Sequence, residues 1–167
     1  LREDVSMVSA ARARTGAHLV DEISAAEARA LVDAGDLITA GALVESLPDS
    51  PQRRLLLARV RLRGGASAAA VASALGDRRG WSRQLLLEAE VLVAAADAGA
   101  LSAPVGARFT AALEEGAASG WVLPFLGHGA AVEAQLQALP LATLHPALAA
   151  ALSNAASDVR RSTRPPH

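Results

Sequence analysis

The residues that could do chemistry are the histidines and a few carboxylates, and their spacing provides no active site. No two histidines lie within five residues of each other, so no local metal-binding pair exists; they are His18, His128, His145 and His167. Adjacent carboxylates such as Asp21 and Glu22 point about 100° apart on a helix, so we interpret them as solvated charges rather than an acid–base pair.

Three common catalytic or nucleotide-binding motifs are also missing. The chain has no Cys, no Lys and no Gly-x-Ser-x-Gly sequence, which excludes a thiol nucleophile, a Gly-Lys phosphate-binding loop and a serine elbow. We therefore predict a protein that is not an enzyme and that needs no cofactor and no metal. An enzyme with a site assembled from distant residues is the third alternative, after the two given below.

Arginine supplies all the basic charge besides histidine, and it is concentrated in one segment. Arg53, Arg54, Arg59, Arg61 and Arg63 crowd a single predicted helix. If the glycines that follow mark the turn of a helix pair, Arg54 and Arg61 line an inner, concave wall, and Arg29 occupies the matching wall one repeat earlier. Guanidinium groups there could hold a carboxylate or phosphate. The alternative is a solvated face paired with neighbouring Asp and Glu residues.

Trp81 and Arg83 complete the candidate binding residues. Trp81 begins a predicted helix beside Arg83, where its ring could stack on a ligand or on the guanidinium group; it could equally cap the end of the core. The predicted ligand- or partner-binding set is Arg29, Arg54, Arg61, Trp81 and Arg83.

The composition predicts an all-α fold. Hydrophobic residues make up 51% of the 167-residue chain, mostly as Ala, Leu and Val, whereas aromatic residues make up only 2%. Ala and Leu are strong helix formers, and few aromatic or β-branched blocks are present to build strands. The net charge of −1 offers no general attraction to nucleic acid or to an anionic membrane. We find no signal peptide and no membrane span, and we expect a cytoplasmic protein.

Periodicity and Gly or Pro punctuation divide the chain into short helices. A Ser24 N-cap with Glu27 three residues later predicts a helix start, and Ser50 followed by Pro51 predicts another. The predicted helices cover 3–17, 25–34, 37–47, 51–63, 67–75, 82–98, 103–118, 130–138 and 146–157, with a short helical or irregular segment at 121–126.

Glycine turns join these helices in pairs. Gly35 and Gly64 are 29 residues apart, and Gly64 and Gly99 are 35 apart, which brackets the tetratricopeptide period of about 34 residues. We predict tetratricopeptide-like helical repeats in a right-handed α-α superhelix; an irregular Ala-rich bundle is the alternative. The expected parts are an N-terminal helix and connector (1–24), the repeat domain (25–157) and a polar tail (158–167). Both ends look like cuts through a longer protein.

The segment 85–139 resembles a known family. A helix pair containing Phe109-Thr110-Ala111-Ala112-Leu113 precedes the turn Gly120-Trp121-Val122-Leu123-Pro124-Phe125-Leu126-Gly127-His128-Gly129, and a Leu-containing helix follows. This is similar to the last repeats of the sensor region in MalT-like large LuxR-type transcription regulators, over roughly residues 25–155. The chain departs from the family at Gly127, where the family usually has Asp.

The resemblance implies an ATP-binding domain upstream and a helix-turn-helix domain downstream, neither of them in this chain. It implies a sensing or protein-interaction module that takes a small-molecule inducer or a protein partner on its concave face and that contacts DNA only through the absent domain. The alternative is a generic tetratricopeptide scaffold from an unrelated protein.

Three further expectations concern packing. Trp121, Phe125 and Phe109 should lie in the core and close the last full repeat, and His128 should be exposed in its Gly-rich turn. The first helix pair should expose an apolar face, so that the chain self-associates as a homo-oligomer or folds its first segment back as a cap.

Overall fold

The regular structure is entirely helical over the part of the chain that the structure describes. This computed structural model describes residues 19–101, 106–126, 128 and 130–162, and no strand occurs among them. The elements are an N-terminal helix over 19–34, α2 (Leu37–Ser46), α3 (Pro51–Arg63), α4 (Ala68–Leu75), α5 (Arg83–Leu101), α6 (Ala107–Ser119), the 3-10 helix η1 (Leu123–Phe125), α7 (Ala130–Gln137), α8 (Leu141–Leu144) and α9 (Pro146–Ser162). The predicted all-α class is confirmed.

Local side-chain chemistry sets the starts of α2, α3 and α4. Ser50 caps α3 by accepting a hydrogen bond from the Arg53 N–H at 3.1 Å, and Pro51 occupies the first helical position, both as predicted. Asp36 caps α2 in the same way through the Thr39 N–H, also at 3.1 Å. A hydrogen bond with the Thr39 side chain, and secondly the one from the Thr39 N–H, lower the pKa of Asp36 below its usual range.

Glycine closes the turns between paired helices. Gly35 and Gly65 have φ values of 87° and 75°, a left-handed conformation that other residues adopt at a cost, and they connect the N-terminal helix to α2 and α3 to α4. The turns predicted at Gly35 and at Gly64-Gly65 are therefore confirmed.

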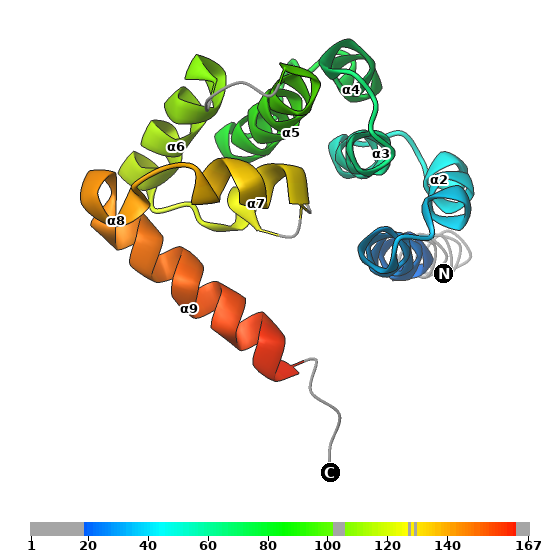
Figure 1. Cartoon of the computed structure of the whole chain (residues 1–167). Helices are drawn as coiled ribbons and strands as arrows, with labels where there is room; N and C mark the ends of the chain where they lie inside the picture. The colour runs from blue at the N-terminus through cyan, green and yellow to red at the C-terminus, as the bar shows by residue number, and fades with distance from the viewer. Residues whose placement is uncertain (1–18, 102–105, 127, 129, 163–167) are drawn as a thin grey trace, which may run out of the picture.

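Consecutive helices pack side by side. Figure 1 shows the N-terminal helix, α2, α3, α4, α5 and α6 following one another along a curved row, with α7 against α5 and α9 extending away. Helix α3 contacts α2 and α4, and it also contacts α5; α5 contacts α6 and α7. A large core runs through α3 to α9, and a smaller cluster of Ala28, Val44, Leu47 and Leu56 joins the N-terminal helix to α2 and α3.

The aromatic residues close the α6 end of the stack. Phe109 and Phe125 are both buried, with ring centroids 6.3 Å apart and ring planes at 81°. This edge-to-face arrangement adds to the energy of burying two rings. Trp121 is half-buried and packs against the same core. The prediction that Phe109 and Phe125 lie in the core is confirmed, whereas Trp121, also predicted there, is only partly buried.

Three predicted boundaries are wrong. Ser24 is not an N-cap, because residues 19–23 are already helical and the chain does not enter from an extended conformation. Gly99 lies inside α5, which continues to Leu101; the Ala-rich flanks outweigh the cost of about 1 kcal/mol for one helical glycine. Helix α9 continues to Ser162, five residues past the predicted end at 157. The helix predicted over 3–17 lies outside the described residues.

Candidate functional site

The arginines of α3 form hydrogen bonds or ion pairs with other segments of the protein. Arg54 donates to the Asp49 carboxylate and, at 2.8 Å, to the Asp77 carbonyl beyond α4. The hydrogen bond to Arg54 lowers the pKa of the Asp49 carboxyl below its usual range. Arg61 donates to the Ala70 carbonyl of α4 at 2.9 Å. Two members of the predicted binding set thus hold the α3–α4 pair together.

The other three arginines of this helix reach different partners. Arg53 donates from Nε to the Val44 carbonyl at 3.1 Å, and Arg63 donates to the Val32 carbonyl, also at 3.1 Å. Arg59 forms an ion pair with Glu88 of α5 at 2.6 Å. Helix α3 therefore connects several helices of the stack, and its guanidinium groups donate hydrogen bonds to carbonyl and carboxylate oxygens of the protein.

Trp81 and Arg83 lie near the start of α5, and the structure gives both of them protein contacts. Trp81 is half-buried and packs against the main core. Arg83 pairs with Glu115 of α6 at 2.6 Å. Together with Arg108, which pairs with Glu90 and Asp97, these charges flank a groove of about 410 Å³ between α5 and α6. Each of these arginines is already paired with a carboxylate of opposite charge.

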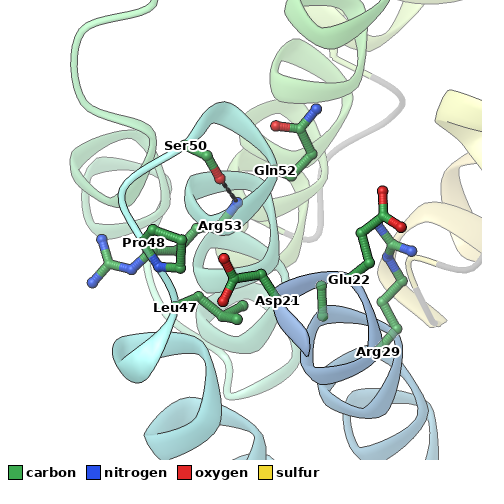
Figure 2. Close-up of a pocket in the computed structure, with 9 residues that line it drawn as sticks. Asp21, Glu22, Arg29, Leu47, Pro48, Ser50, Gln52 and Arg53 are labelled. Atoms are coloured by element: carbon green, nitrogen blue, oxygen red, sulfur yellow. Dashed lines mark hydrogen bonds between the residues drawn. The ribbon is translucent and has the colours of Figure 1, made fainter. Parts of the chain in front are cut away.

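A second cavity, larger than this groove, lies between the N-terminal helix and the α2–α3 turn. It has a volume of about 550 Å³ and includes Arg29 of the predicted set. We call it the N-terminal pocket. Its lining consists of Asp21, Glu22, Ala25, Arg29, Leu47, Pro48, Ser50, Gln52 and Arg53. Figure 2 shows Asp21 on the side of the N-terminal helix toward Leu47 and Pro48, and Glu22 and Arg29 on the other flank of that helix, with their charged groups beside each other in this view.

The floor and the rim of the N-terminal pocket differ in polarity. Ala25 and Leu47 belong to or pack against the small apolar cluster, so the floor is hydrophobic. At the rim, Arg53 already bonds to Val44, and the Ser50 hydroxyl oxygen accepts the Arg53 N–H. Asp21, which is half-buried, and Arg29, which is exposed, have no partner among the described residues. The pocket thus offers one carboxylate and one guanidinium group to a ligand.

The sequence alone did not reveal this pocket. Asp21 and Glu22 were noticed only as adjacent carboxylates, and Gln52 carried no signal. The only sequence signal near this pocket is Pro48, which follows the end of α2 and favours the turn that faces the N-terminal helix.

A second polar region is buried. The prediction that His128 is exposed is wrong: its side chain is 2% exposed, and neither ring nitrogen has a hydrogen-bond partner in the described part of the chain. Burial, and secondly the positive charge of Arg59, lower the pKa of His128 to about 3; the nearby Pro124 carbonyl acts in the opposite direction, although its geometry does not meet that of a hydrogen bond. The ring is neutral at physiological pH and is a core residue.

Two negative findings apply to residues 19–101, 106–126, 128 and 130–162. No group of three or more His, Asp or Glu side chains there is placed to hold a metal ion. Within the same ranges, no helix is both long enough and apolar enough to cross a membrane. Comparisons with protein-family models, with curated proteins and with solved structures find no match for this chain.

Proposed function

We propose that this chain is a non-enzymatic recognition module made of stacked, tetratricopeptide-like helix pairs, and that the N-terminal pocket is its binding site. The observation that carries the proposal is the 550 Å³ pocket with an apolar floor and two unmatched charges at its rim. Concave pockets with an apolar lining and a few placed polar groups are typical ligand sites.

The packing order supports the repeat architecture. Helix α3 contacts its partner α4 and also α5, the helix that begins the next pair. A stack of this kind buries the apolar face that one pair cannot bury alone. We propose in addition that the helix pairs form a right-handed superhelix.

The parent protein is, in this proposal, a bacterial transcription regulator of the MalT-like type, on the strength of the turn at 120–129 described above. The pocket would then sense a small molecule and pass its state to other domains. The second candidate is a scaffold that binds a protein partner. The α5–α6 groove favours this candidate, because its positive and negative side chains are present together and suit the polar surface of another protein. The coding sequence on both sides separates the two: a nucleotide-binding loop upstream and a helix-turn-helix downstream identify the regulator.

A thermal-shift screen of small polar metabolites tests the pocket directly. A ligand at one hundred times its Kd should stabilise the folded chain by about 2.7 kcal/mol. The variant Gln52→Trp places a large ring at the exposed rim of the pocket and should abolish the shift. The matched control is Gln84→Trp at the exposed start of α5, which should keep the shift. A screen without a hit, or a hit that survives Gln52→Trp, contradicts the proposal.

A further inference from the structure

The outer face of the N-terminal helix is apolar and exposed. Leu19 and Ile23 are 54% and 66% exposed, and Ala26 and Ala30 are exposed as well. These four residues are spaced i, i+4, i+7, i+11, which places them on one side of a helix. That side lies opposite Ala28, which is fully buried in the small apolar cluster. We call the four residues the outer stripe.

The outer stripe lies at the end of the stack. Figure 1 shows the N-terminal helix at one end of the curved row of helices, beside α2. A helix at the end of a repeat stack needs either a polar outer face or a cover, because no further repeat buries it. Here the outer face is apolar, and its small residues Ala26 and Ala30 allow another helix to approach closely. The stripe therefore has the composition of a helix–helix interface.

The sequence that precedes the N-terminal helix carries a matching pattern. Four of its residues repeat the spacing i, i+4, i+7, i+11 of the outer stripe, and they are Leu1, Val5, Val8 and Arg12. Because this spacing reads the same in both directions, a helix over these residues can lie antiparallel on the outer stripe with all four positions opposite each other. The midpoint of that arrangement falls between Thr15 and Gly16, and glycine is common at helix ends.

In this antiparallel arrangement, large side chains face small ones. Leu1 would lie opposite Ala30, and Val5 would lie opposite Ala26. Such pairing lets two helices pack at the short end of the usual interaxial range of about 8–10 Å. It also removes the exposed Leu and Ile side chains of the outer stripe from water, which supplies the driving force.

Opposite charges meet on both flanks of the same arrangement. Arg29 and Glu27 are exposed and lie on opposite sides of the outer stripe. Asp4 would come beside Arg29, and Arg2 would come beside Glu27, each two residues from the position directly opposite. Two residues correspond to about 3 Å along a helix axis, which an arginine side chain can span.

We propose that residues 1–13 form a helix that folds back on the outer stripe and caps the end of the stack. A segment joined by a short turn is present at an effective concentration in about the millimolar range, so it occupies the stripe in preference to a second copy of the chain. Of the two outcomes expected for an exposed first helix pair, this inference selects the cap. It does not depend on the ligand of the N-terminal pocket.

Disulfide trapping tests the contact directly, because the chain has no cysteine of its own. In Val5→Cys/Ala26→Cys, mild oxidation should close a disulfide within one chain, seen as a monomer of altered mobility on a non-reducing gel. The matched control is Val5→Cys/Asp33→Cys, whose second position is also exposed on the same helix but lies about 10 Å farther along its axis. The control should form its disulfide at least about tenfold more slowly.

Limited proteolysis tests the packing without a crosslink. Ile23→Asp places a charge in the outer stripe and should speed tryptic cleavage after Arg12 at least about tenfold, measured against cleavage after Arg79, whose side chain is 94% exposed. The matched control is Ile38→Asp, the same change at an α2 residue that is 89% exposed and lies outside the outer stripe. It should leave the ratio of the two cleavage rates unchanged.

Each outcome supports or overturns the cap. A disulfide that joins two chains assigns the outer stripe to a second copy and overturns the inference. Equal oxidation rates for the two cysteine pairs, or unchanged cleavage after Arg12 in Ile23→Asp, also overturn it. Circular dichroism verifies the fold of every variant, and the two tests change different residues of the stripe, so one variant that fails to fold leaves the other test decisive.

Discussion

The ring of Phe125 lies against Gly116 of α6 so closely that a side chain at position 116 has no space. A Cβ atom built on Gly116 would be 2.8 Å from Phe125 Cζ and nearer still to Cε2. Because the Phe125 ring is itself held edge-to-face by Phe109, it cannot move aside without disturbing the core. The absence of a side chain at Gly116 therefore lets the segment after α6 pack closely against that helix.

Replacing Gly116 with Ala should therefore destabilise the protein by about 2 kcal/mol, the usual range for overpacking. Urea unfolding followed by circular dichroism measures the change. The matched control is Gly41→Ala in α2, where the new Cβ would meet only Val60 Cγ1 at 3.8 Å. There the higher helix propensity of Ala should stabilise the protein by about 0.5–1 kcal/mol. Equal effects of the two substitutions would argue against the Phe125 contact.

Burial of His128 should make stability pH-dependent. The pKa of His128 is about 3 in the folded protein, below the ordinary value of about 6.5 that applies when unfolded. Between these values the unfolded chain binds one more proton, so the free energy of unfolding falls as pH falls from about 6.5 toward 3, by at most about 1.4 kcal/mol per pH unit. The contribution is complete above pH 6.5.

The variant His128→Gln tests this pH dependence. It should be less stable at neutral pH, because a polar amide replaces the packed ring, yet its stability should decline less steeply with acid. The carboxylates titrate in both proteins and cancel in the comparison. Parallel stability curves for the two proteins between neutral pH and about pH 4 would show that His128 does not couple folding to protonation.

The ion pair between Arg59 and Glu88 should matter more than its surface counterparts. The two side chains are 18% and 17% exposed, so Arg59→Ala leaves a largely buried carboxylate without its partner and should cost about 3 kcal/mol. The double variant Arg59→Met/Glu88→Leu should recover much of that loss. For comparison, breaking the pair of Arg83, which is 73% exposed, with Glu115 should cost below about 1 kcal/mol. Additive single and double variants at 59 and 88 would contradict a buried pair.

Arg63 should control the order of the N-terminal helix. Its guanidinium group donates to the carbonyls of Val32 and Asp33 at 3.1 and 3.2 Å in the last turn of that helix, where the Val32 carbonyl also accepts the Gly35 N–H. Arg63→Ala should cost about 1.5–3 kcal/mol. It should also speed amide hydrogen exchange over 19–34 more than in α6, whereas Arg79→Ala should change neither. Uniform exchange across both helices would place the role of Arg63 elsewhere.

The sequence was sufficient to predict helix starts and turns that depend only on neighbouring residues. The start of α3 depends on Ser50 and Pro51, and the turn after it depends on Gly65, so neighbouring residues carry the whole physical cause. Composition was likewise enough to predict an all-helical chain. Local signals failed at Ser24 and Gly99 because a helix already under way needs only one more hydrogen bond per residue, and a single unfavourable residue does not stop it.

The tertiary structure alone decided which polar groups meet. Arg63 finds its acceptors some thirty residues earlier in the chain, and Arg54 finds one twenty-three residues later, distances at which no sequence pattern predicts pairing. His128 looked exposed between two glycines, yet it is buried beside Arg59. The sequence determined where the helices form, because helix formation is a local equilibrium. Packing decided which partners the arginines of α3 contact, because only the stack sets which carbonyls and carboxylates come within reach.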